Sequence, residues 1–153
     1  MKRIEVKLAL PVVAPLLDVI KGLGDSLRGR LAAPIALDDL EPEFKRSWED
    51  ELLLAQSGEV ATLLALFNDE FFSEGVVAFD ESNAEPIVRA CAAVRLHLRE
   101  RYLRPLGDDT LEGGDVDLAT LPEPLRKAFM CYLFLATIQE LIIQHLDETI
   151  LGT

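Results

Sequence analysis

Cysteine and histidine are scarce in this chain of 153 residues, with two of each. The cysteines, Cys91 and Cys131, are forty positions apart and lie in apolar helical patterns, where a thiol behaves as a small hydrophobic group. Neither His97 nor His145 has a glutamate three positions before it, so the Glu-x-x-His pairs of ferritin-like dimetal centres are absent. We therefore expect no disulfide, no metal and no cofactor, and a reducing, cytoplasmic location.

Clusters of basic residues and long uncharged runs are also lacking. The chain has 27 acidic against 15 basic side chains and a formal net charge of −12. This excess repels the phosphate backbone and anionic lipid surfaces, so we expect no nucleic-acid partner and no membrane partner. The uncharged run 128–138 is shorter than the roughly 20 residues of a membrane span, and the N-terminal residues lack the apolar stretch of a signal peptide.

Apolar residues make up half of the sequence, and the length is that of one domain, so we expect residues 1–153 to form a single helical domain. The expected fold class is all-α, a bundle of four to five helices around a central C-terminal helix. Alternating apolar and charged residues over 4–10 predict one short strand, and the β-branched run 76–79 has room for a second. These two segments would pair as a two-stranded β annex.

Helical spacing of apolar residues predicts a first helix over residues 16–31 and a second that begins at Pro42, since proline suits the first turn. The expected core stripe of the second helix consists of Phe44, Trp48, Leu52 and Ala55. Continuing this stripe would bury Glu59, whereas a fresh stripe starts just after it. We therefore predict a bend or break at 57–58.

The segment from Leu125 to Leu151 is strongly apolar, and an acidic loop at 105–121 precedes it. Because the run 128–138 carries no charge, we expect its helix to be covered on every side, at the centre of the bundle. Glu140 is the anomaly in this helix. A carboxylate in such surroundings must be paired, hydrated or protonated, and we expect an arginine beside it.

Arginines gather on the third predicted helix, which begins at residue 82 or 83. Arg95 and Arg99 are one turn apart and project together. One interpretation is a site for an anion or an acidic partner, and the other is a set of ion pairs with the acidic second helix or with Glu140. The candidate anion or ion-pair site comprises Arg95, Arg99, Glu140 and His97. For His97 we also expect a satisfied structural role.

The fragment Gly24-Asp25-Ser26-Leu27 is similar to the nucleophile block of GDSL-type esterases and lipases. This resemblance implies a serine hydrolase with Ser26 as nucleophile. Two later blocks of that family, Gly-x-Asn-Asp and Asp-x-x-His, complete the site. Here Asn68-Asp69 lacks the glycine, and His145 follows Ile142 where the family requires aspartate. A serine without an oriented base is not activated, so a degenerate hydrolase is the lesser alternative.

The glycines Gly22, Gly24 and Gly29 lack the spacing of a phosphate-binding loop. We expect them instead where a helix bends or packs closely. The acidic loop starts like a calcium loop at Asp108, but its twelfth position is Ala119 rather than glutamate, which favours a solvated loop.

Four short motifs coincide with those of one known family. They are Phe44-Lys45-Arg46 before an acidic helix, Val77-Ala78-Phe79-Asp80 before another helix, Val94-Arg95-Leu96, and Gln139-Glu140 in an apolar closing helix. On these motifs the chain from Phe44 to about Asp147 resembles an uncharacterised bacterial family of helical domains of unknown function, often encoded beside the Clp protease adaptor. Arg95 matches the arginine of the family's Leu-Arg-Leu motif, whereas Pro86 and about Cys91 stand where the family has tryptophan and asparagine. The resemblance implies a fold and no mechanism.

The function that the sequence favours is a non-enzymatic protein-interaction or regulatory module, with a protein partner or a second copy of the chain. Phe71 and Phe72 would belong to its contact surface. A second hypothesis is a protein that binds an anion or small ligand on the arginine face of the third helix. The third is the degenerate hydrolase at Ser26.

Overall fold

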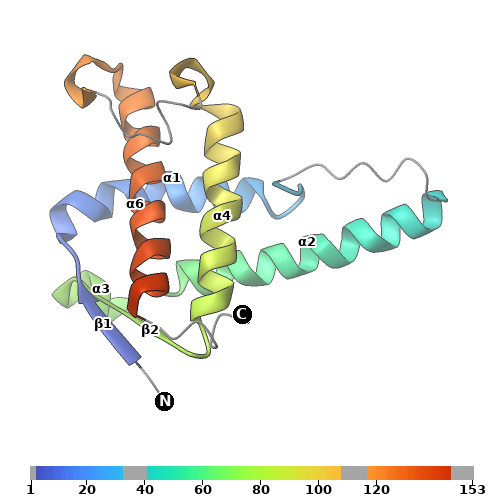
Figure 1. The fold of residues 1–153 in the computed structure, drawn as a ribbon, viewed down its shortest axis with the longest axis horizontal. Coiled ribbons are helices and arrows are strands. Elements are labelled where there is room, and N and C mark those ends of the chain that lie inside the picture. Colours follow the sequence, from blue (N-terminus) through green and yellow to red (C-terminus); the bar gives the residue numbers. More distant parts are fainter. Residues whose placement is uncertain (1–2, 33–40, 108–116, 146–153) are drawn as a thin grey trace.

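A computed structural model of the chain describes residues 3–32, 41–107 and 117–145 (Figure 1). It is mainly helical with one small sheet, which confirms the predicted fold class. In chain order the elements are β1 (Arg3–Lys7), α1 (Leu10–Ser26), α2 (Pro42–Leu64), α3 (Asp69–Glu74), β2 (Val76–Asp80), α4 (Ala84–Arg101), the 3-10 turns η1 (Arg104–Leu106) and η2 (Leu118–Thr120), and α6 (Glu123–His145). Residues 108–116 of the predicted acidic loop and the end of the predicted last helix lie outside the described residues.

The predicted β annex is confirmed. β1 and β2 pair antiparallel, with Ile4 opposite Phe79 and Val6 opposite Val77. The period of two places Val77 and Phe79 in the core and leaves the charged residues of β1 exposed. The sheet therefore covers one edge of the bundle with a single apolar face.

α1 begins at Leu10, earlier than the predicted residue 16, and ends at Ser26 rather than at residue 31. Pro11 lies in its first turn, where a missing N–H breaks no helical hydrogen bond, so this proline starts the helix instead of only ending the strand. Pro15 lies farther along the helix on its exposed side, where water can reach the carbonyl that loses its partner.

α4 packs against α1, α2 and α6 and so lies at the centre of the fold (Figure 1). Apolar residues at helical spacing form its buried stripe: Ile87, Cys91, Val94 and Leu98. The helix begins at Ala84, slightly later than the predicted residue 82 or 83. Asn83, just before it, ties the helix to β2: its side chain accepts a hydrogen bond from the backbone N–H of Asp80 (2.8 Å) and donates to the carbonyl of Ala78 (3.1 Å).

α6 is buried on one face only. Phe129, Leu135 and Ile142 lie in the core, whereas Thr137 and Ile143 are exposed. The prediction that the run 128–138 is covered on every side is therefore wrong, because α1 and α4 pack on one side of it. Among the described residues, α6 is the one helix long and apolar enough to span a membrane, a test of length and composition that a soluble core helix also passes.

α2 is one continuous helix, so the predicted break at 57–58 is wrong. Gly58 lies on the exposed side, and Glu59 needs no burial because it pairs with Arg89 of α4. The buried residues of α2 all lie in its C-terminal half: Gln56, Val60 and Leu63. The helix thus contributes to the bundle with only part of its length.

Residues 42–54, which we call the α2 arm, project beyond the rest of the bundle (Figure 1). The side chain of Phe44 is 66% exposed and that of Trp48 is 54% exposed. The predicted core stripe is therefore wrong for these two residues and for the exposed Ala55. The apolar pattern is present, but no described part of the chain covers it.

Close packing joins α1 to α2 at Gly24. A Cβ atom on this glycine would lie 3.0 Å from Cγ1 of Val60 and 3.6 Å from Cδ1 of Leu64. The expectation that a glycine marks close helix packing is therefore confirmed here. Gly22, two positions earlier, has nothing within 4 Å of such an atom.

The turn after α1 is held by the buried side chain of Gln56. Its amide donates to the carbonyls of Leu27 (2.8 Å) and Arg30 (2.9 Å), and its oxygen accepts from the N–H of Ala32 (3.0 Å). These bonds satisfy backbone groups that would otherwise lack partners at the helix end. One side chain of α2 thus fixes the path of residues 27–32.

Replacing Gln56 by leucine keeps a similar volume but removes these three hydrogen bonds. We expect the free energy of unfolding to fall by about 1–3 kcal/mol, because buried backbone groups lose their partners. Urea denaturation measures this loss. Gln144→Leu is the matched control, since Gln144 is exposed and bonds only Glu140 among the described residues. Equal losses in both variants would contradict the proposed role of Gln56.

Candidate functional site

The structure separates the four residues of the predicted anion or ion-pair site. Glu140 is exposed, and its carboxylate accepts a hydrogen bond from Nε2 of Gln144 (3.1 Å). The arginine expected beside Glu140 instead contacts the preceding residue, since Arg95 donates to Oε1 of Gln139 (2.7 Å). The expected pairing of Glu140 with this arginine is therefore wrong.

Arg95 has a structural role between α4 and α6. Its guanidinium lies 4.4 Å from the ring centroid of Tyr132, and Gln139 also donates to the carbonyl of Val88 (3.0 Å). Stacking on an aromatic ring and a hydrogen bond to a bridging amide hold this cation without a carboxylate. The motif arginine thus joins the two helices at the core.

The other arginines on α4 and just beyond it have different partners. Arg89 pairs with Glu59 of α2 and with Glu85, which confirms the expected ion pair with the acidic second helix. Arg104, just beyond the helix, pairs with Glu100. Arg99 is half-buried on α4 and also interacts with the rest of the chain. Arg101 is different, because it faces α1.

An unexpected contact joins Ser26, the last residue of α1, to His97 of α4. Nε2 of His97 lies 3.2 Å from Oγ of Ser26, and Nη1 of Arg101 donates to the same oxygen over 3.4 Å. The hydroxyl of Ser26 donates to this nitrogen or accepts from it, according to which ring nitrogen of His97 carries the proton. The predicted structural role of His97 thus comes with a polar partner that the sequence did not reveal.

Burial keeps this imidazole uncharged. His97 is only 3% exposed. Loss of solvent lowers its pKa below the ordinary value, and the positive charges of Arg101 and Arg30 lower the pKa further. At neutral pH the ring is therefore uncharged and adds no charge to its surroundings.

A pocket of about 420 Å³ opens beside Ser26, and we call it the Ser26 pocket. Three helices line it: α1, the end of α4 and the start of α6. Its lining residues are Asp18, Val19, Gly22, Leu23, Ser26, Arg101, Tyr102, Pro124, Lys127 and Ala128. The size and the mixture of apolar walls with a few polar groups are typical of small-molecule sites.

The Ser26–His97 contact has two of the groups of a serine hydrolase site. His145, the histidine expected from the family resemblance, is exposed at the far end of α6, about 27 Å along the helix from Lys127. Within the described residues no carboxylate is bonded to His97, so its ring lacks the third group that orients a catalytic base. The geometry therefore favours binding at Ser26 over acyl transfer.

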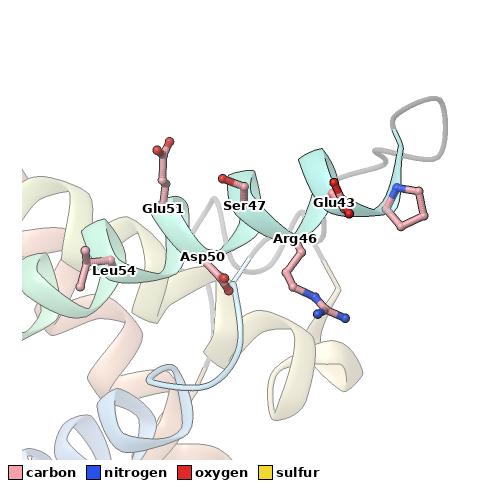
Figure 2. A pocket seen from close by; sticks show the side chains of 7 residues that line it. Glu43, Arg46, Ser47, Asp50, Glu51 and Leu54 are labelled. Atoms are coloured by element: carbon pink, nitrogen blue, oxygen red, sulfur yellow. The ribbon is translucent and has the colours of Figure 1, made fainter.

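A second hollow lies along the α2 arm. Figure 2 shows that its lining side chains all come from one helix, with Ser47 and Glu51 on one side and Arg46 and Asp50 on the other. These groups diverge around the helix and do not converge on one point. The hollow is therefore part of an open surface and has no geometry of a small-molecule site.

A third hollow, of about 460 Å³, lies between α2 and α4, and we call it the α2–α4 groove. It is mainly apolar and is floored by small side chains of both helices. Its lining residues are Leu31, Ala32, Leu52, Ala55, Gln56, Glu59, Arg89, Ala92, Ala93 and Leu96. It lies at the base of the α2 arm and continues the apolar side of that arm.

Metal and thiol chemistry find no support in the part of the chain that the structure describes. No group of three His, Cys, Asp or Glu side chains there could hold a metal ion. Cys91 and Cys131 are buried, and loss of solvent raises the pKa of each thiol to about 12. Both thiols are therefore protonated at neutral pH and behave as core residues.

Comparison with known proteins identifies one family. The sequence matches the family described as domain of unknown function (DUF2017) over residues 22–146, which is most of the chain. No curated protein and no solved structure matches. The match includes Ser26 and His97, the α2 arm and nearly all of the lining of the Ser26 pocket, of which Asp18 and Val19 lie before it.

The buried His97 predicts a pH dependence of stability. The imidazole of an unfolded chain has a pKa of about 6.5, and the folded value is lower. Below about pH 6.5 the unfolded state therefore binds a proton that the folded state does not bind, and the free energy of unfolding decreases as the pH is lowered. When the pH is lowered from about 7 to about 5, we expect the free energy of unfolding, measured by urea denaturation, to decrease less in His97→Gln than in the natural chain.

His145→Gln is the control, because it removes the other histidine from an exposed position. It should keep the pH dependence of the natural chain. If His97→Gln keeps the same dependence as His145→Gln, the imidazole of His97 is not held uncharged by the fold.

Proposed function

We propose that this chain, which belongs to the DUF2017 family of domains of unknown function, is a protein-interaction module that associates with a second copy of itself through the α2 arm. The observation that carries the proposal is the apolar face of the arm, with Phe44 and Trp48 more than half exposed. Large aromatic side chains at the centre of an interface commonly supply much of its binding energy.

The arm gains little support from its own bundle. Its apolar side chains recur every four residues at Phe44, Trp48 and Leu52, the spacing of a helix face that packs on another element. Helices in proteins are stabilised mainly by such packing, and short isolated ones are marginal in water. A partner on this face would supply the missing contacts.

The α2–α4 groove offers a matching surface at the base of the arm. Ala55, Ala92 and Ala93 leave space in it, and Leu52 and Leu96 make its walls apolar. Two arms side by side in opposite directions would bring the aromatic residues of each arm to the groove of the other copy. Such a two-fold contact uses the same patch on both copies.

Charge also favours a second copy as the partner. The α2 arm has four acidic and two basic residues, whereas α4 has four arginines and two glutamates. Of these arginines, Arg89 lines the α2–α4 groove, so an acidic arm of a second copy would meet this cation there. Opposite potentials across an interface fix its partner and orientation more than its raw affinity.

Phe44→Asp tests this contact while keeping Trp48, the single tryptophan, as a probe. We expect the natural chain to be a dimer by light scattering, with tryptophan emission that shifts to longer wavelength on dilution. Phe44→Asp should raise the dimer dissociation constant at least tenfold, as loss of a central aromatic does, and should move the change in tryptophan emission to correspondingly higher concentration.

Phe71 is fully buried, so the expectation that it belongs to a contact surface is wrong, and the present proposal places the contact on the arm instead of at Phe72. Phe72→Asp is therefore the matched control, since Phe72 in α3 is 55% exposed and lies outside the arm. This variant should remain a dimer, and circular dichroism should show both variants folded. A natural chain that stays monomeric, or a dimer that Phe72→Asp dissociates and Phe44→Asp does not, would refute the proposal.

A further inference from the structure

We propose that the Ser26 pocket binds a small organic oxyanion, a carboxylate or phosphate carried on an apolar body. This site is separate from the α2 arm and does not depend on self-association. It is argued from the charges, the hydroxyl and the apolar walls that three helices bring together.

Two cations of the pocket favour an anionic ligand. Arg101 and Lys127 both line it, from the end of α4 and the start of α6. Whereas Arg89 and Arg104 form ion pairs, neither of these two cations forms one with any described residue. Two cations that share a pocket without a carboxylate partner attract an anion to it.

The hydroxyl of Ser26 lies beside one of these cations, Arg101. Oγ of Ser26 lies 3.2 Å from Nε2 of His97 and 3.4 Å from Nη1 of Arg101, so these two side chains hold the hydroxyl at the pocket wall. The Arg101 contact of 3.4 Å is long for a hydrogen bond, so the guanidinium can turn toward a better acceptor at little cost. A guanidinium binds carboxylate and phosphate through two parallel N–H groups.

The walls of the pocket favour a ligand whose uncharged part is apolar. Val19, Leu23, Pro124 and Ala128 form the apolar surface of the pocket. Gly22 also lines it, and a Cβ atom added there would meet nothing within 4 Å. The space above this glycine has room for the apolar part of a ligand whose charged end meets Arg101 and Lys127.

Asp18 limits the choice of ligand. Its carboxylate lies at the same pocket, so the three charged side chains leave a net charge of one cation. A highly charged polyanion would be repelled by Asp18, whereas a ligand with one anionic group can approach the cations alone. The pocket therefore favours a small ligand of low charge over nucleic acid.

The test titrates the full chain with phenyl phosphate and with benzoate, followed by amide signals in NMR spectra, with phenol as the neutral comparison. We expect saturable binding of at least one anion with a dissociation constant in the millimolar range or tighter, with shifts at Gly22 and Ser26, and weaker binding of phenol. Phenyl phosphate and benzoate distinguish phosphate from carboxylate preference. Arg101→Gln should raise the dissociation constant of the bound anion at least tenfold.

Gly22→Leu should fill the pocket and abolish binding, and it should stay folded because leucine favours a helix more than glycine. Gly58→Leu is the matched control, because Gly58 is also an open helical glycine but lies on α2, away from the pocket. It should bind as the natural chain does, and so should Phe44→Asp. No saturable binding by the natural chain, or binding that survives Gly22→Leu, would overturn the proposal.

Discussion

The burial of α4 is the constraint on which the rest of the structure depends. This helix contacts α1, α2 and α6, and its stripe of Ile87, Cys91, Val94 and Leu98 is fully buried. The polar residues beside that stripe must therefore find partners on neighbouring helices, because a buried polar group without one is costly. Arg95 meets α6 in this way, and His97 meets α1.

Much of the architecture could be predicted from the sequence, because apolar periodicity and turn residues agree at the two strands and at α4. The same reasoning failed for α2, and the failure is physical. A stripe such as Phe44, Trp48 and Leu52 shows that a helix face is suited to burial, but the pattern is identical whether the cover is the same chain or another one. The exposed stripe is therefore the observation on which the proposed contact surface rests.

The candidate site could be predicted less well, because it joins distant parts of the chain. Ser26 and His97 are 71 positions apart, and no local pattern connects them. The error at Glu140 has a simpler cause. Successive residues of a helix point about 100° apart, so an arginine on one side of α6 reaches Gln139 while Glu140 faces solvent. The arginine contact was therefore expected at the correct turn of α6, but at Glu140 instead of at its neighbour Gln139.

The two proposed surfaces meet at one short turn. Ser26 closes α1 at the pocket, and Leu31 and Ala32, a few residues on, line the α2–α4 groove. Gln56, which also lines the groove, holds the backbone between them at Leu27 and Arg30. One side chain of α2 therefore supports the short stretch of chain that leads from the proposed pocket to the wall of the proposed groove.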